Sequence, residues 1–137
     1  MDRKATIKAI KTGLQKRSGR KWSVTGGRGT AWGWLTIDAP PARRTCHAVL
    51  KAGAVTDYPE DYEEKDTGEP GGCMTIADRE ELAGLLGLET VHHQGVSIPA
   101  SSKYWEEHVD RAQGHKPEKC GVSYWEVNRK DIRHEQR

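Results

Sequence analysis

The chain has 137 residues, of which 34% are hydrophobic and 31% are charged. This size predicts one domain with a single hydrophobic core. No apolar segment approaches the ~18 residues of a membrane-spanning helix or has the features of a secretory signal, and three cysteines without close spacing favour a reducing compartment. We therefore expect a cytoplasmic protein that is not bound to a membrane.

The net charge of +2 conceals a strong asymmetry along the chain. Residues 1–51 carry twelve Lys and Arg against two Asp, whereas the rest of the chain carries ten basic and eighteen acidic residues. Acidic residues are concentrated over residues 57–69. This asymmetry indicates a polyanionic partner for the basic part, neutralisation of that part by the acidic segment, or pairing of the two parts between the copies of a homodimer.

The chain opens with apolar residues at helical spacing. Ile7, Ile10 and Leu14 predict an amphipathic helix over residues 4–17, with lysines on its other faces. Gly19 follows the last turn, as is typical of a helix end.

A glycine-rich hairpin is expected next. Residues 21–25 and 31–37 alternate in polarity and predict two antiparallel strands, joined by a turn over residues 26–30. Residues 46–55 are apolar enough for a helix or a strand, and their periodicity does not decide between the two; we expect a helix over residues 42–52. Residues 57–72 are acidic and rich in Gly and Pro, which predicts an irregular, mobile loop.

The second half completes a mixed pattern of helices and strands. The expected elements are a helix capped by Thr75 and ended by Gly87, a strand over 91–98, a helix stopped by Gly114, a strand over 122–127 and a polar tail over 128–137. The order predicts an α+β fold with three or four helices packed on one antiparallel or mixed sheet of about four strands. Residues 1–127 would form a single domain.

Residues 17–34 combine basic residues, tryptophans and glycines more densely than any other segment. Glycines allow backbone N–H groups to converge on an anion, arginine binds phosphate through two hydrogen bonds, and an indole offers a stacking face to a base. The predicted ligand-binding residues are Arg20, Lys21, Gly26, Gly27, Arg28, Gly29, Trp32, Trp34, Arg43 and Arg44. In the alternative interpretation the glycines serve the turn and the tryptophans, with Trp32 and Trp34 on one strand face, belong to the core.

Metal binding and catalysis have less support in the sequence. The cysteines and histidines show none of the paired spacings of structural zinc sites, so we expect neither a metal nor a cofactor. A Cys–His nucleophile, or acid–base chemistry by His108 with Tyr104 or Asp110, would need side chains that the sequence does not bring together. We therefore expect a binding protein rather than an enzyme.

Residues 5–40 resemble a family found in phages and other bacterial mobile elements. The helix, the Trp22-Ser23-Val24 strand, the glycine turn and the segment from Trp34-Leu35 to Ala39-Pro40 are similar to the large polyvalent protein-associated domains. The resemblance implies an accessory or anti-defence protein in a bacterial cytoplasm and transfers no catalytic residue.

Together these features predict a non-enzymatic binding protein of a phage or mobile element. Its basic hairpin would hold a phosphate-bearing ligand, either a nucleotide or a single-stranded nucleic acid. In the alternative function, the acidic segment 57–69 binds and inhibits a protein of a bacterial defence system.

Overall fold

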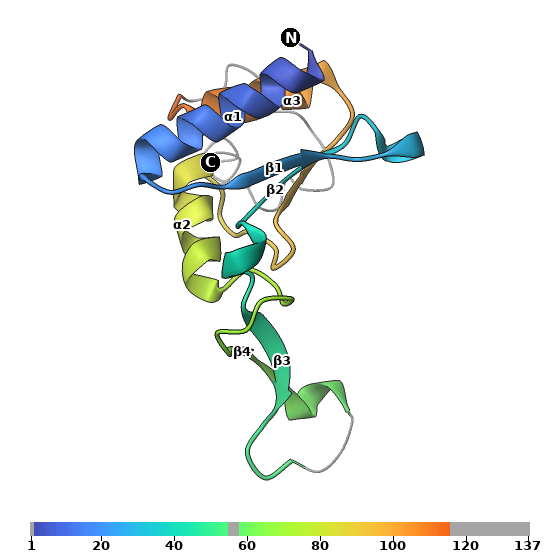
Figure 1. Cartoon of the computed structure of the whole chain (residues 1–137), viewed down its shortest axis with the longest axis vertical. Helices are drawn as coiled ribbons and strands as arrows, with labels where there is room; N and C mark the ends of the chain where they lie inside the picture. The colour runs from blue at the N-terminus through green and yellow to red at the C-terminus, as the bar shows by residue number, and fades with distance from the viewer. Residues whose placement is uncertain (1, 55–57, 116–137) are drawn as a thin grey trace, which may run out of the picture.

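The structure is a computed structural model that describes residues 2–54 and 58–115. Within these residues it contains three α-helices and five strands, which confirms the predicted α+β class (Figure 1). The elements are the helices α1 (Arg3–Ser18), α2 (Ile76–Leu86) and α3 (Ser102–Ala112) and the strands β1 (Ser23–Gly26), β2 (Leu35–Asp38), β3 (Cys46–Leu50), β4 (Tyr62–Asp66) and β5 (Val96–Ile98). The strand expected over 122–127 and the tail over 128–137 lie outside the described residues.

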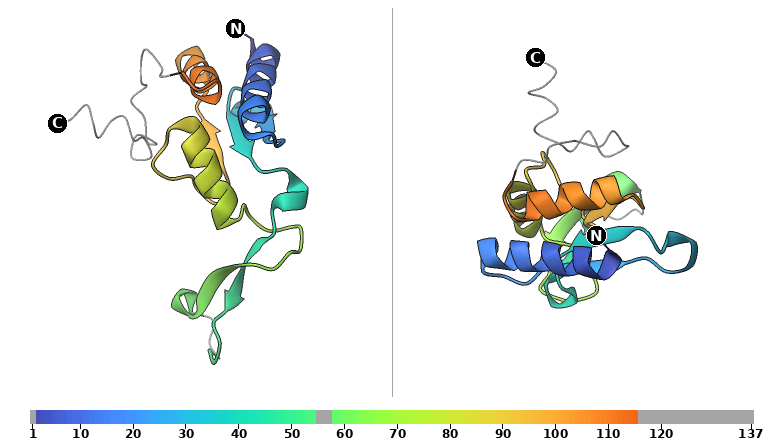
Figure 2. Two further views of the ribbon diagram at one scale, coloured as in Figure 1. Left: turned by 90° about the vertical axis from the view of Figure 1, so that its left-hand side faces the viewer. Right: turned by 90° about the horizontal axis from the view of Figure 1, so that it is seen from above.

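The strands are divided between two sheets, whereas the sequence predicted one. Strands β1, β2 and β5 form an antiparallel sheet in the order β1-β2-β5, in which Ile37 lies opposite both Val24 and Val96. Helices α1 and α3 pack side by side over this sheet, and α2 packs against α3 (Figure 2). We call these three helices and three strands the body.

The hydrophobic core lies between the helices and the three-stranded sheet. Ile10 and Leu14 of α1 are fully buried, as are Leu35 and Ile37 of β2. The first pair lies four residues apart on one face of a helix, and the second lies two residues apart on one face of a strand. Burial of each such side chain contributes about 1.5–3 kcal/mol.

Local capping signals set the ends of α1 and α2; the sequence predicted Gly19, Thr75 and Gly87 in these roles but not Asp2. Asp2 precedes α1, and its side chain accepts a hydrogen bond from a backbone N–H of the first turn. Thr75 does the same for α2, since its hydroxyl oxygen accepts from the N–H of Asp78 at 3.2 Å. Gly19 and Gly87 follow the two helices with φ of +72° and +67°, a conformation that favours glycine.

Arg17 joins the three helices at one point. Its Nη1 donates to the carbonyl oxygens of Leu85, Arg111 and Ala112 at 2.8, 3.0 and 3.1 Å. These carbonyls belong to the last turns of α2 and α3, where helix carbonyls lack partners within the helix and a cation is favourable. Arg17 therefore has a structural role through its Nη1.

Two predictions for the segment that connects β2 to α2 are wrong. The helix expected over 42–52 is replaced by β3, and the loop expected over 57–72 contains β4. The two strands form a separate antiparallel sheet, with Cys46 opposite Asp66 and Leu50 opposite Tyr62. This two-stranded sheet, which we call the arm, projects from the body (Figure 1).

Strand β4 was missed because its sequence does not favour a strand. It reads Tyr-Glu-Glu-Lys-Asp, and Glu, Lys and Asp are depleted in strands. Its backbone pairs with β3 throughout, so a partner distant in the sequence determines its conformation. Four of its five residues are exposed, as charged side chains on a sheet without a core of its own should be.

Candidate functional site

The predicted ligand residues lie at two ends of the β1–β2 hairpin. At the closed end, the hairpin tip (residues 27–34) carries Gly27, Arg28, Gly29, Trp32 and Trp34, with Gly26 at the adjoining end of β1. At the open end lie Arg20, Lys21, Arg43 and Arg44. Four residue pairs separate the two ends, about 10 Å along an extended strand. The structure therefore divides the predicted site into two groups.

The backbone of the tip requires glycine at positions 27 and 29, whereas Gly26 faces the end of a flexible side chain. A Cβ on Gly27 would overlap the backbone oxygen of Ala31, and a Cβ on Gly26 would overlap the Arg3 guanidinium. Gly29 has a φ of +59°. The turn itself explains Gly27 and Gly29, whether or not their N–H groups meet an anion.

Trp32 is exposed and stacked on a cation that the sequence reasoning missed. Its side chain is 56% exposed, and the Arg3 Cζ lies 4.7 Å from the centroid of its ring. Arg3 Nη2 also donates to the carbonyl oxygen of Gly27 at 3.0 Å, which fastens the tip to the start of α1. No sequence signal singled out Arg3, because Lys4 is also a cation of the first helical turn and forms no salt bridge with another described residue.

Trp34 is also at the surface, with 38% of its area exposed. Both tryptophans lie before β2 begins, because the 3₁₀ turn Gly29–Ala31 shortens the expected strand over 31–37, so they do not share a strand face. Trp105 of α3 donates from Nε1 to the carbonyl oxygen of Gly33 at 3.2 Å and fixes the tip from the other side. The tip is thus a braced structure with exposed indoles.

The cations of the open end are largely neutralised within the molecule. Arg20 forms salt bridges with Asp78 at 3.0 Å and Glu81 at 2.8 Å, both on α2. Arg43 Nε lies 3.9 Å from Asp78, and its Nη2 donates to the carbonyl oxygen of Lys21 at 2.6 Å. An anionic ligand would have to compete with these carboxylates.

Trp22 forms the base of the open end. It is buried, its Nε1 donates to the Ser18 hydroxyl at 3.1 Å, and the Arg43 guanidinium lies 4.8 Å from its ring centroid. Arg44, the next residue after Arg43, forms a salt bridge with Asp38, with 3.3 Å between Nε and Oδ2. Burial raises the pKa of Asp38, and the Arg44 charge only partly offsets that effect. These contacts make the open end a structural junction.

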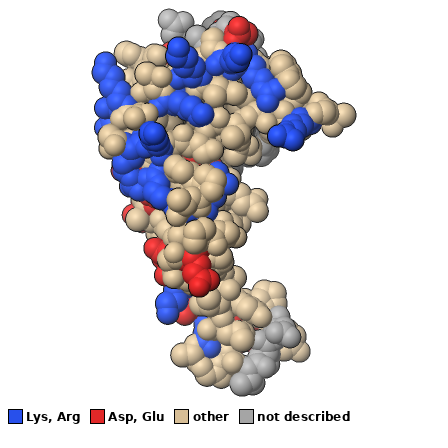
Figure 3. All heavy atoms as spheres, in the orientation of Figure 1, with Lys and Arg blue, Asp and Glu red and all other residues tan. Residues whose placement is uncertain are grey.

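A third basic group, absent from the predicted set, lies on the exposed side of α1. Lys4, Lys8 and Lys11 recur at helical spacing and are exposed, and none forms a salt bridge with another described residue. They extend about 10 Å along the helix and start beside Arg3, which contacts the tip. In Figure 3, Lys and Arg side chains cover the face formed by α1 and the hairpin, and Asp and Glu gather toward the arm.

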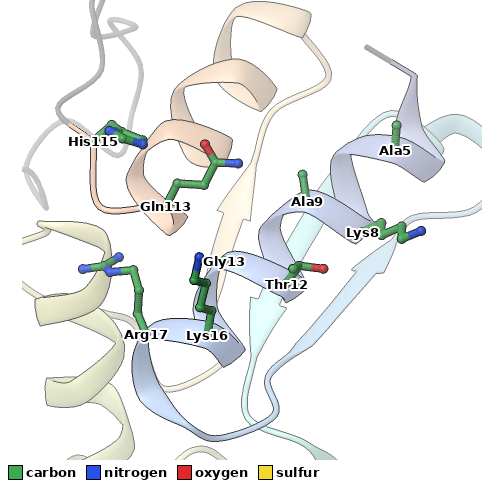
Figure 4. Close-up of a pocket in the computed structure, with 9 residues that line it drawn as sticks. All are labelled: Ala5, Lys8, Ala9, Thr12, Gly13, Lys16, Arg17, Gln113 and His115. Atoms are coloured by element: carbon green, nitrogen blue, oxygen red, sulfur yellow. The ribbon is translucent and has the colours of Figure 1, made fainter.

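A groove borders the lysine row on the side of α3. It has a volume of about 710 Å³ and lies between α1 and the residues that follow α3 (Figure 4). Lys8 and Lys16 line it together with the small residues Ala5, Ala9 and Gly13. A Cβ on Gly13 would lie 2.9 Å from the carbonyl oxygen of Ala112, so glycine permits the close approach of the two helices.

The acidic segment 57–69 does not neutralise the basic face in the described residues. Among the described residues, this segment forms an ion pair between Glu64 and Arg79 of α2, with an N–O distance of 3.1 Å. The counter-charges at the open end come instead from Asp38, Asp78 and Glu81. The expectation of neutralisation by segment 57–69 is therefore not met there.

His108, which was considered for acid–base chemistry, lies in the interior of the described structure. His108 is fully buried, and its Nδ1 lies 3.1 Å from the carbonyl oxygen of Tyr104, to which it must donate. Across residues 2–54 and 58–115, no three His, Cys, Asp or Glu side chains are placed to hold a metal ion. Over the same residues, no helix is both long and apolar enough to cross a bilayer.

Comparison with protein-family models, with curated proteins and with solved structures finds no match to this chain. The resemblance of residues 5–40 to domains of mobile elements stays a prediction.

Proposed function

We propose that the protein binds single-stranded nucleic acid across the exposed side of α1 and the hairpin tip. The observation that carries this proposal is the lysine row on α1, which lacks salt bridges to described residues and adjoins an exposed indole. Lys4, Lys8 and Lys11 would contact phosphates, and Trp32 would stack on a base. A non-enzymatic role of this kind requires no metal or cofactor.

The length of the basic surface favours a polymer over a single nucleotide. The lysines extend about 10 Å along α1, and Arg28 at the tip adds an exposed cation beyond them. A mononucleotide would occupy a small part of this surface. Arg3 covers one face of the Trp32 ring, and the large exposed fraction of that side chain supports stacking on the rest of the ring.

The first test measures the anisotropy of a labelled single-stranded oligonucleotide at several salt concentrations. Trp32→Ala should weaken binding about 5- to 150-fold, since stacking contributes about 1–3 kcal/mol per base. Trp32→Phe keeps an aromatic face and should lose much less. An equal loss in both variants, or none in either, would contradict the role of Trp32.

The second test separates phosphate contacts from general charge. Lys8→Ala should lower the salt slope of binding by about 0.7, the contribution of one phosphate contact to a single strand. Lys65→Ala removes the same charge from β4 of the arm and is the matched control. The salt slope of binding should fall in Lys8→Ala and stay unchanged in Lys65→Ala. Identical salt slopes in the two variants would argue against binding along α1.

A second candidate function uses the arm, as the sequence alternative proposed. Strand β4 exposes Glu63, Glu64 and Asp66, and Leu50 and Tyr58 expose 44% and 64% of their area. An acidic surface with exposed apolar groups suits a basic protein partner, such as a protein of a bacterial defence system.

Charge reversal distinguishes the two functions. Glu60→Lys with Glu63→Lys changes the arm but leaves the Glu64–Arg79 salt bridge intact. This double variant should keep or strengthen nucleic-acid binding if α1 is the binding surface, because it removes repulsion. Loss of a protein partner in the same variant would favour the arm.

A further inference from the structure

Two cysteines lie directly opposite each other where the arm joins the body. The N–H of Cys46 donates to the carbonyl oxygen of Cys73 at 2.9 Å, and the N–H of Cys73 donates to the carbonyl oxygen of Cys46 at 2.8 Å. An antiparallel pair that exchanges both hydrogen bonds has Cα atoms about 5.5 Å apart and side chains on the same face. That separation lies inside the range of about 4.4–6.8 Å that a disulfide spans.

The geometry of the Cys46–Cys73 pair also determines how easily a disulfide between the two residues would be reduced. The Cβ atoms of a hydrogen-bonded pair lie about 5 Å apart, whereas a disulfide holds them at about 3.8 Å. Bond formation must therefore shift the backbone inward by about 1 Å. A disulfide under such strain is reduced more readily than a relaxed one, which suits a reversible bond rather than a permanent one.

The surroundings of the two thiols give them different roles. Cys46 is buried, and burial raises its pKa in spite of the nearby Arg79 guanidinium, whose Nη2 lies 3.7 Å from the Cys46 Sγ. Cys73 is only partly buried and is the more exposed of the two residues. An external reagent therefore reaches Cys73 first, and Cys46 can then react with Cys73 within the protein.

We propose that Cys46 and Cys73 form a reversible redox modification site, oxidised by a low-molecular-weight disulfide such as glutathione disulfide. The Cys73 thiol loses its proton, its sulfur attacks the glutathione disulfide, and one glutathione thiolate leaves. The Cys46 thiol then loses its proton and attacks the Cys73 sulfur, which forms the Cys46–Cys73 bond and releases the second glutathione. Two protein thiols are oxidised, one glutathione disulfide is reduced, and the two protons pass to the released thiolates.

The bond would fasten the arm to the segment that leads into α2. Strands β3 and β4 lie in the chain between the two cysteines, so oxidation encloses the arm in a covalent loop. Loop closure restricts the unfolded states of the arm and thereby stabilises it. Oxidation would change the arm and leave the lysine row on α1 chemically unchanged.

The test uses the full chain with the substitution Cys120→Ser. This variant keeps two of the three cysteines, Cys46 and Cys73. The protein is equilibrated in glutathione buffers of increasing disulfide content, the free thiols are alkylated, and the products are measured by mass spectrometry. The native protein should form the internal disulfide at a ratio of glutathione disulfide to glutathione about tenfold lower than the same protein in urea, because the fold holds the thiols together. Adding Cys46→Ser should leave a persistent glutathione adduct on Cys73.

Two outcomes would overturn the proposal. Equal ratios in native and unfolded protein would show that the fold does not bring the thiols together for reaction. Accumulation of the Cys73 adduct in the protein that keeps Cys46 would show that Cys46 does not resolve it. The comparison of native with unfolded protein needs no change to either cysteine, so it holds even if Cys46→Ser fails to fold.

Discussion

The body and the arm are held together by different interactions. In the body, apolar side chains such as Leu14 and Ile37 are fully buried between helices and sheet. In the arm, paired backbones hold β3 to β4, and four of the five β4 residues are exposed. Side-chain burial makes the body resistant to local opening, whereas a two-stranded sheet alone is only marginally stable.

The two regions also differ in charge. The exposed side of α1 is basic, and the exposed residues of β4 are mainly acidic. Because the arm projects away, the basic face of α1 keeps cations that are not paired with described residues (Figure 3). The separation leaves one surface suited to an anionic ligand and another suited to a basic one.

The largest expected contrast is in stability. Ile37→Ala removes a fully buried side chain of β2 and should lower the free energy of unfolding by about 2–5 kcal/mol. Leu50→Ala on β3 removes a side chain that is 44% exposed and should cost less than about 1 kcal/mol. Urea unfolding followed by far-ultraviolet circular dichroism, which reports on the backbone of both regions, measures the two losses. Equal losses would mean that the arm has a core of its own.

A smaller effect should be confined to the base of the arm. Arg79 donates to the carbonyl oxygen of Met74 at 3.0 Å, pairs with Glu64 and contacts the Cys46 sulfur. Arg79→Met should therefore speed amide hydrogen exchange in β3 and β4 several-fold while exchange in β2 stays unchanged. Arg111→Met, which removes contacts to the end of α2 instead, is the control and should affect the body. Uniform acceleration in the Arg79 variant would contradict a separate arm.

The smallest expected effects depend on pH and have opposite signs in the two regions. The hydrogen bond from Arg79 lowers the pKa of Glu64, so its stabilising contribution is present above the pKa of unfolded Glu and is lost as pH falls through the folded pKa. Burial raises the pKa of Asp38, so its contribution is complete below the pKa of unfolded Asp and is lost as pH rises through the folded pKa.

Hydrogen exchange in β4 and unfolding of the body, each measured between about pH 3 and 6, separate these effects. Glu64→Gln should reduce the loss of β4 protection in acid, with the remainder due to Asp66, whose pKa the Thr45 hydroxyl lowers. Asp38→Asn should remove the opposite trend in the body. The same sign in both regions would show that other groups dominate.

Local signals predicted the body better than the arm. The spacing of Ile7, Ile10 and Leu14 with Gly19 located α1, and Thr75 with Gly87 located α2, so neighbouring residues were enough for these helices; the Asp2 cap was not predicted. Strand β4 depends on pairing with β3 across a long stretch of sequence, and its charged side chains give no strand signal. Patterns within one short segment of sequence do not reveal which distant segment it will pair with, so they could not predict β4.

The candidate site shows the same limit. The sequence identified Trp32 and Arg28 as unusual, and both are exposed at the hairpin tip. It could not show that Asp78 and Glu81 neutralise Arg20, because these residues meet only when α2 packs beside the hairpin. The lysines of α1 were assigned to a solvated helix face, which is also what a phosphate-binding face looks like in sequence.

The opposed position of Cys46 and Cys73 has a consequence for the engineering of the chain. The chain leaves the body at Cys46 and returns to it at Cys73, and these two residues are paired. The arm between them belongs to a separate sheet, so its length does not affect the pairing of β1, β2 and β5. A tight turn grafted in place of residues 47–72 would preserve the connectivity of every helix and strand around it. An arm of different length or sequence can therefore be placed between residues 46 and 73 without rebuilding the hydrophobic core of the body.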